Sequence, residues 1–263
     1  MERIKQALEK AREERQIRGG TEPAPTPART ETGKIEYAQT QPVSLDVDVL
    51  RRNRIVTGLA PGPFTESYKM LRTQILQRFK ENNWNVLGVT SPGEGEGKTL
   101  TAINLAISIT REVEYSVLLV DANLRNPQML EHLGLPQRKG LSDYLTGDVT
   151  MTELLIQPDP IEHLVILPGG TPQANSGEML NSPKMAELVQ GMKSRYHGRI
   201  IIFDLPPVLT SADALAFSPY VDAALLVVEE GVTEKQDLER AVELLGSTNI
   251  VGTVLNKAEP PRN

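Results

Sequence analysis

Short runs of apolar residues alternate along this chain with longer stretches in which apolar residues recur at helical spacing. Buried strands are predicted at Val86–Thr90 and near residues 116–120, 163–167, 200–203, 223–228 and 250–255. Helices are predicted over Thr65–Lys80 and near residues 99–111, 183–196, 211–217 and 233–246. Continuous Val, Ile and Leu runs separated by helices indicate an α/β fold with a mostly parallel, doubly wound sheet that is covered on both faces.

The pattern is different before residue 46. Residues 1 to about 18 are charged, and their thin apolar face of Ile4, Leu8 and Ala11 fits either a solvated helix or a docking helix for a partner. Residues 19–45 contain Gly-Gly, several prolines and threonines, a composition with too little apolar surface to order itself. We therefore expect an N-terminal charged helix and linker over 1–45, one domain over 46–258 and a short tail over 259–263.

Composition narrows the classes of function. The chain has 263 residues, no cysteine and a formal net charge of −6, which argues against broad nucleic-acid binding because phosphate contacts need a basic surface. The absence of cysteine fits a reducing cytosol. The apolar runs are of strand length, far from the roughly 20 residues of a membrane span, and no secretory segment follows Met1. A cytoplasmic location is expected.

A glycine-rich segment follows the run that ends at Thr90. Glycines at positions 93, 95 and 97 let consecutive backbone N–H groups turn toward one ligand. Lys98 adds a positive charge, and Thr99 offers a hydroxyl at a helix N-terminus, which attracts anions. The strict pattern G-x-x-x-x-G-K-[ST] has glycine where this chain has Pro92, and a glycine-rich surface turn is the alternative. The flanking strand and helix favour a phosphate loop, and hence a P-loop NTPase fold.

Two further predicted strands end in an aspartate. Asp121 follows Val117-Leu-Leu-Val, and Asp204 follows Ile200-Ile-Ile-Phe. Buried parallel strands deliver such carboxylates to the edge of the sheet where ligands bind, although a single aspartate after a strand is usually an ordinary turn residue. Thr99, Asp121 and Asp204 together predict a Mg²⁺ site beside the phosphates of ATP.

These segments resemble the nucleotide-site motifs of the bacterial tyrosine autokinases that work with polysaccharide export. In that family the motifs are a relaxed phosphate loop, D-x-D-x-R and D-x-P-P, and this chain has Gly93-Glu-Gly-Glu-Gly-Lys-Thr99, Asp121-Ala-Asn-Leu-Arg125 and Asp204-Leu-Pro-Pro207. The similarity covers about residues 40 to 257. It implies an ATP- and Mg²⁺-dependent tyrosine kinase that a membrane chain-length regulator recruits to the inner face of the membrane.

The resemblance also implies roles for individual residues. The expected catalytic residues are Lys98, Asp121, Arg125 and Asp204. Nucleotide contacts are expected from the loop residues Gly93, Glu94, Gly95, Glu96, Gly97, Lys98, Thr99 and Leu100. Asn256 is expected to contact the base of the nucleotide. Asp121 is expected to orient or deprotonate the attacking hydroxyl, and Arg125 to pair with a carboxylate. For Asn256 the alternative is a turn residue without contact to the nucleotide, because an asparagine after a strand is equally often a plain turn former.

A charged triplet lies on the first predicted helix of the domain. Glu66, Lys69 and Arg72 share one face because residues three apart are neighbours on a helix. The family has E-x-x-R-x-x-R here, which supports ring assembly, so the resemblance implies a homo-oligomer through this helix. A solvated, salt-bridged helix face is the alternative.

The chain departs from its family and from related partition ATPases at several positions. Gly93 stands where the partition ATPases carry a signature lysine, which disfavours a sandwich dimer of that kind. Asn123 replaces the second aspartate of D-x-D-x-R, and no tyrosine follows Tyr220, so a C-terminal tyrosine cluster is absent. Three hypotheses remain: a kinase acting on another protein or on Tyr37, a regulatory ATPase of an export complex, and a nucleotide-gated scaffold.

Overall fold

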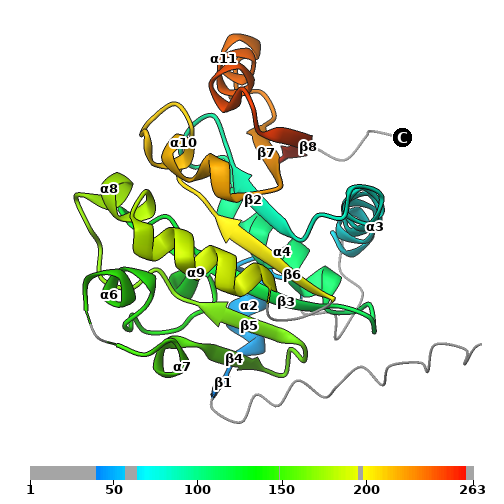
Figure 1. The fold of residues 1–263 in the computed structure, drawn as a ribbon. Helices are drawn as coiled ribbons and strands as arrows, with labels where there is room; N and C mark the ends of the chain where they lie inside the picture. The colour runs from blue at the N-terminus through cyan, green and yellow to red at the C-terminus, as the bar shows by residue number, and fades with distance from the viewer. Residues whose placement is uncertain (1–39, 57–63, 148, 195–197, 259–263) are drawn as a thin grey trace, which may run out of the picture. The chain divides into compact units, whose positions relative to one another are not determined.

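The computed structural model describes residues 40–56, 64–147, 149–194 and 198–258, in which helices alternate with strands (Figure 1). The strands are β1 (Gln41–Ser44), β2 (Val86–Thr90), β3 (Ser116–Asp121), β4 (Ile156–Asp159), β5 (Leu164–Leu167), β6 (Arg199–Asp204), β7 (Ala223–Glu229) and β8 (Asn249–Asn256). The longer helices are α3 (Thr65–Asn82), α4 (Lys98–Ile109), α9 (Pro183–Ser194) and α11 (Lys235–Leu245). The short helices are α2 (Val47–Arg52), α5 (Met129–His132), α6 (Leu141–Thr146), α7 (Met151–Leu154), α8 (Ser176–Leu180), α10 (Asp213–Phe217) and the 3₁₀ turn η1 (Ser218–Tyr220).

All eight described strands form a single sheet in the order β1-β4-β5-β3-β6-β2-β7-β8. Neighbouring strands are parallel except β4 and β5, which pair in the antiparallel direction. The predicted α/β fold with a mostly parallel sheet is therefore confirmed. Strands β2, β3, β6 and β7 run the same way at the centre of the sheet, so their carboxyl ends meet at one edge.

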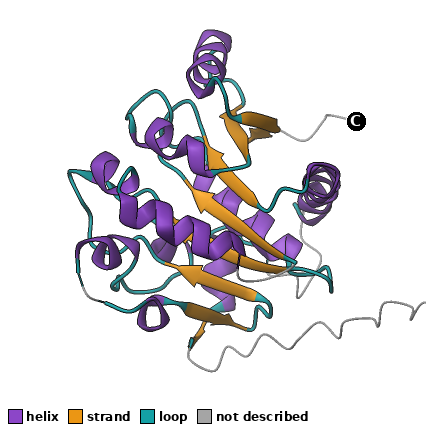
Figure 2. Ribbon diagram, viewed as in Figure 1, coloured by secondary structure: helices purple, strands orange, loops and turns teal. Residues whose placement is uncertain are grey.

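Helices cover both faces of the sheet, as the purple ribbons in front of and behind the orange strands show (Figure 2). One core packs α2, α3, α4 and α5 against alternate strand residues such as Leu87, Leu119 and Ile202. The other packs α6 to α11 against the intervening residues, such as Val120 and Phe203. Because both faces are buried, β2 and β3 are apolar at nearly every position instead of alternating with polar residues.

The sheet begins earlier in the chain than the sequence predicted. Gln41–Ser44 forms β1 and pairs with β4, so the boundary at residue 46 falls inside the sheet domain. Pro42 and the polar neighbours made this segment resemble a linker, yet proline is tolerated in an edge strand, where β1 lies. The predicted N-terminal helix, Tyr37 and the tail over 259–263 lie outside the described residues. Among the helices that are described, none is both long and apolar enough to cross a membrane.

Candidate functional site

The segment between β2 and α4 has the backbone of a phosphate loop. Gly95 (φ 76°) and Gly97 (φ 94°) adopt left-handed conformations that other residues rarely take, and Gly97 caps the N-terminus of α4. The N–H of Thr101 donates to the carbonyl of Gly97 and makes the first turn of the helix. The N–H groups of Lys98, Thr99 and Leu100 precede that bond and lack intrahelical acceptors, as at any helix N-terminus. They are suited to an anion.

The loop after β6 supports the first part of the phosphate loop. The hydroxyl of Thr90 donates to the carbonyl of Pro206 at 2.7 Å. The N–H groups of Val208 and Leu209 donate to the carbonyls of Ser91 and Pro92, at 2.8 and 3.1 Å. Pro92 is therefore used for its carbonyl, and the N–H that proline lacks is not needed. This is a physical reason why the loop tolerates proline where the strict pattern has glycine.

Lys98, Thr99 and Asp204 meet at the start of α4. The hydroxyl of Thr99 donates to Oδ2 of Asp204 at 2.6 Å, and Nζ of Lys98 lies 3.5 Å from Oδ1 of the same carboxylate. Asp204 is fully buried at the end of β6, and its Oδ1 has no hydrogen-bond donor among the described residues. A buried carboxylate oxygen without a donor costs free energy, so this atom is available to a cation or to water.

Asp121 lies directly beside Asp204 in the neighbouring strand. The two residues are register partners in the parallel pair of β3 and β6. The carboxylate of Asp121 accepts the N–H groups of Asn123 and Met129, both at 3.1 Å. Complete burial, and secondarily the negative charge of Asp204, raise the pKa of Asp121 to about 7. A cation beside the two carboxylates would oppose this effect and favour their ionised forms.

The donor set at this edge fits a magnesium ion. Oxygen atoms of Thr99, Asp121 and Asp204 are the hard ligands that Mg²⁺ prefers. Within the described ranges no three His, Cys, Asp or Glu side chains gather into a metal-binding group. The protein would thus supply a hydroxyl and two carboxylates, and phosphate oxygens and water would complete the shell, as is usual for magnesium bound with a nucleotide.

Arg125 lies in the loop after β3 and finds a carboxylate partner, as predicted. Its guanidinium approaches Oδ1 of Asp213 at 3.8 Å, and the hydroxyl of Ser176 donates to the other oxygen of that buried carboxylate. The carbonyl of Leu124 accepts the N–H of Gln173 at 2.9 Å. These contacts join the segments that follow β3, β5 and β6.

Asn256 contacts the phosphate loop. At the end of β8, its side-chain amide donates to the carbonyl of Glu96 at 2.8 Å. It also packs so closely on Gly97 that a Cβ there would collide with it. The side chain therefore supports the phosphate loop, and contact with a nucleotide base remains a prediction.

Three features of the loop were not anticipated. Glu96 is buried, and its carboxylate accepts the N–H of Gly93 at 2.9 Å. That N–H is therefore engaged within the loop, and the predicted backbone contacts to phosphate fall on the residues after Gly93. Glu94, in contrast, is exposed. Thr233, in the loop after β7, donates its hydroxyl to Glu96. The only sequence signal for Thr233 is its place just after a buried strand.

A second glycine segment covers Asp121. Gly169 follows β5, and a Cβ there would lie 2.5 Å from Cβ of Pro127 and 3.2 Å from Cγ of Asp121. The next residue, Gly170, has a positive φ of 87°. Glycine is required here because the backbone passes close to the carboxylate. A side chain at position 169 would therefore displace the backbone beside Asp121.

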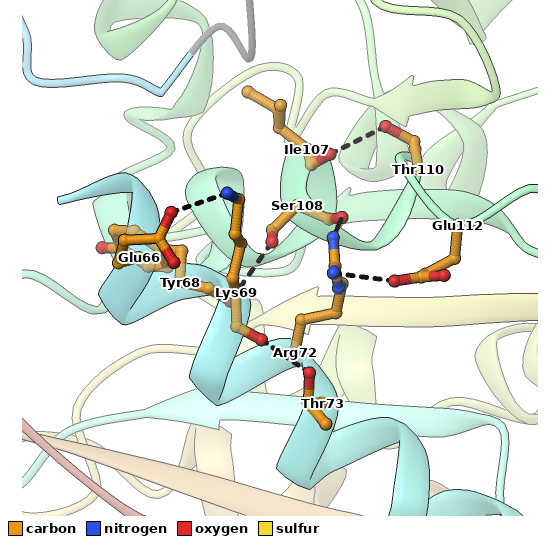
Figure 3. Close-up of polar contacts among 9 residues, drawn as sticks. All are labelled: Glu66, Tyr68, Lys69, Arg72, Thr73, Ile107, Ser108, Thr110 and Glu112. Atoms are coloured by element: carbon orange, nitrogen blue, oxygen red, sulfur yellow. Dashed lines mark hydrogen bonds and ion pairs between the residues drawn. The ribbon is translucent and has the colours of Figure 1, made fainter. Parts of the chain in front are cut away.

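The charged triplet on α3 is only partly available for assembly (Figure 3). Arg72 donates to the carbonyl of Ser108 at 3.0 Å and pairs with Glu112 at 2.7 Å, so it fastens α3 to the end of α4. Lys69 pairs with Glu66 at 2.6 Å on the exposed face of the helix. Arg72 thus has an internal role, and assembly through this helix remains a prediction that rests on Glu66 and Lys69.

Comparisons with known proteins found similar sequences and structures. No family model matches the chain. Tyrosine-protein kinase YwqD of Bacillus subtilis (strain 168) is 32% identical over 209 residues, which cover 79% of this chain and 86% of that protein. The crystal structure of the VpsO kinase domain superposes with a TM-score of 0.65 at 28% identity, over 74% of this chain and 96% of that one. The septum site-determining protein MinD from Pyrococcus horikoshii OT3, solved with Mg-ADP, shares the fold at 24% identity and a TM-score of 0.54, over 67% of this chain and 74% of that one.

Proposed function

The chain belongs to the bacterial tyrosine-protein kinase family, and on that premise we propose that it transfers the γ-phosphoryl group of ATP to tyrosine hydroxyls. The observation that carries the proposal is the convergence of Lys98, Thr99 and two buried carboxylates at the N-terminus of α4. A helix N-terminus binds phosphate, and paired carboxylates hold the metal ion that accompanies it. One edge of the sheet thus offers the parts that phosphoryl transfer requires.

Each residue then has a defined task. The N–H groups at the start of α4 hold the β-phosphate, and Lys98 stabilises negative charge that develops on the β,γ-bridging oxygen. Mg²⁺, held by Thr99, Asp204 and Asp121, would neutralise charge on the phosphates. Asp121 orients the tyrosine hydroxyl and accepts its proton. The phenolic oxygen forms a bond to the γ-phosphorus as the bond to the bridging oxygen breaks, which yields phosphotyrosine and ADP.

The cellular setting is a further part of the proposal. The protein acts in exopolysaccharide or capsule biosynthesis, at the inner face of the membrane, through a membrane chain-length regulator that docks on the sheet domain. If this is so, the protein co-purifies with a membrane protein from cell membranes. Deletion of residues 1–39 tests whether the N-terminal extension takes part. A chain that never enriches with a membrane protein contradicts this setting.

A second function is favoured by one observation. Asn123 stands where the family has an aspartate, and its N–H supports the carboxylate of Asp121 at 3.1 Å. The site therefore has one carboxylate fewer, which favours a regulatory ATPase with little kinase activity. Under this alternative, Asn123→Asp increases phosphotyrosine formation and changes nucleotide affinity by less than about tenfold, because the loop and Lys98 hold most of the phosphate charge.

The test separates the two functions directly. Purified protein is incubated with ATP and Mg²⁺, alone and with a tyrosine-containing polymer, and phosphotyrosine is located by mass spectrometry while phosphate release is measured in parallel. Phosphotyrosine that disappears in a folded Lys98→Ala variant supports the kinase. Phosphate release without phosphotyrosine supports the ATPase. If neither phosphotyrosine nor phosphate is formed, both functions are contradicted.

A further inference from the structure

The structure assigns a positioning role to Glu96, Thr233 and Asn256, which form a clamp that holds the phosphate loop ready for nucleotide from the β7 and β8 side of the site. This inference rests on the proposed function, because it concerns the same nucleotide site. The two aspartates that we propose as metal ligands, Asp121 and Asp204, lie on the opposite side, at the ends of β3 and β6. The loop between them is thus held from both sides.

Glu96 is the centre of the clamp. Its side chain is only 4% exposed, although it carries a carboxylate in a loop. One oxygen accepts the N–H of Gly93 at 2.9 Å, and the other accepts the hydroxyl of Thr233. Both oxygens are therefore satisfied by donors, which is the condition for burying a carboxylate. The first bond closes the loop on itself, and the second ties it to another part of the chain.

Thr233 is itself held in one orientation. Its hydroxyl oxygen accepts the N–H of Glu229 at 2.8 Å, and its own N–H donates to the carbonyl of the same residue at 3.1 Å. The single hydroxyl proton is therefore left to point at Glu96. Glu229 ends β7 and pairs with Lys257 at 2.7 Å. The position of Thr233 is thus fixed by the central sheet.

Asn256 provides the third contact. Its side-chain amide donates to the backbone carbonyl of Glu96 at 2.8 Å, and its own carbonyl accepts the N–H of Glu230 at 3.0 Å. Asn256 is the register partner of Glu229 in the pair of β7 and β8. Glu96 is therefore held from two neighbouring strands. Thr233, after β7, bonds its side chain, and Asn256, at the end of β8, bonds its backbone.

The clamp reduces the cost of binding nucleotide. Glycine loses more conformational freedom than any other residue when it is ordered, and the loop has glycines on both sides of Glu96. Hydrogen bonds to a buried carboxylate are stronger than those between neutral groups. A loop that is ordered before binding loses less conformational entropy when the phosphates bind. The clamp stabilises bound ATP and the transition state equally, so it lowers KM and leaves kcat unchanged.

Conservative variants provide the test. Thr233→Val keeps the shape and removes the hydroxyl, whereas Thr233→Ser keeps the donor. Glu96→Gln can still accept from Gly93 and donate to Thr233, whereas Glu96→Ala cannot. Thr73→Val is the matched control, because the hydroxyl of Thr73 donates to the backbone of its own helix, at the carbonyl of Lys69. The affinity for a fluorescent ADP analogue and the KM for ATP are measured for each variant.

Thr233→Val is expected to weaken nucleotide binding and raise KM about tenfold, the effect of one lost hydrogen bond to a charged acceptor, with kcat within about twofold. Glu96→Ala removes the bonds to both Gly93 and Thr233 and is expected to raise KM by at least as much. Thr233→Ser and the control remain close to the wild type. Glu96→Gln keeps both contacts but loses the charge, so its KM lies between those of the wild type and Glu96→Ala. The double variant Thr233→Val/Glu96→Ala binds nucleotide no more weakly than Glu96→Ala alone, because Glu96→Ala already removes the bond to Thr233. Asn256→Ala, which leaves the buried Glu96 in place, also raises KM and provides a test that does not disturb the carboxylate.

The possible failures can be told apart. Equal nucleotide affinity in the wild type, Thr233→Val and Asn256→Ala contradicts the clamp. So does a loss in Thr233→Ser as large as in Thr233→Val. A lower kcat at unchanged KM also contradicts it, because the loop would then act in the transition state alone. A wild-type protein that binds no ADP analogue contradicts the proposed function itself.

Discussion

The stability of the nucleotide-free protein should depend on pH through Asp121, and replacing this residue should remove the dependence. Asp121 is buried beside Asp204, and its pKa is raised from 3.8 to about 7, first by burial and then by the neighbouring charge. An acid with a raised pKa in the folded state holds its proton after the unfolded chain has released it. The folded state is therefore destabilised as pH rises from about 4 to 7, with no further change above that range.

The size of the effect follows from the two pKa values. At about 1.36 kcal/mol for each pKa unit, the rise to about 7 corresponds to about 4 kcal/mol at pH 8. In Asp121→Asn the amide resembles the protonated acid, but its NH₂ faces one of the two backbone N–H groups that the carboxylate accepts. This mismatch costs about 1 kcal/mol. We expect the variant to be more stable than the wild type by about 3 kcal/mol at pH 8.

The assay is urea unfolding of both proteins at pH 5, 6, 7 and 8 without nucleotide or Mg²⁺. The difference in the free energy of unfolding should fall below about 1 kcal/mol at pH 5, because Asp121 is then protonated in the folded wild type. Titrations of other groups cancel between the two proteins. Mg²⁺ with ADP should reduce the advantage of the variant at pH 8, since a bound cation stabilises the ionised carboxylate. A difference that stays constant from pH 5 to 8, or a less stable variant at pH 8, would refute the reasoning.

Three further outcomes are expected. Lys98→Ala should lower ATP turnover about 100- to 1,000-fold with the fold intact by circular dichroism, because it removes the charge that faces the bridging oxygen; unchanged hydrolysis would rule out the assigned role. Gly169→Ala should lower turnover by about 100-fold through displacement of the backbone over Asp121, and ADP affinity measured by fluorescence should stay within about twofold. Arg72→Ala should lower the free energy of unfolding by about 2 kcal/mol, because it removes contacts to Ser108 and Glu112, whereas Ala at the exposed Arg78 of the same helix should change it by less than about 0.5 kcal/mol.

The sequence predicted the central strands and the residues at their ends because one physical pattern governs both. A buried parallel strand is apolar at every position, and a following glycine or aspartate stands out against it. Lys98, Asp121 and Asp204 could be placed at one edge for this reason, and the structure brings them together there. The register of β3 against β6 could not be predicted, yet it is what makes the two aspartates neighbours.

Features that depend on contacts between distant segments were missed. β1 and β4 are four residues long, and each contains a proline, so neither has a strand pattern. The burial of Glu96 could not be predicted, because glutamate in a glycine-rich loop is usually solvated and one of its two hydrogen-bond donors, Thr233, is 137 positions away. Arg72 was placed on an exposed face by its helical spacing, whereas it contacts Ser108 in the last turn of α4 and Glu112 in the turn that follows.

The central claim is that this site moves the γ-phosphoryl group of ATP to a tyrosine. A single-turnover experiment with γ-labelled ATP, Mg²⁺ and excess protein tests it most directly, because it records where the label goes. The account predicts that label appears on protein as phosphotyrosine, stable to alkali, and that Lys98→Ala and Asp204→Asn abolish this transfer. Label found only in inorganic phosphate, with no phosphotyrosine on the protein or an added acceptor, would contradict it.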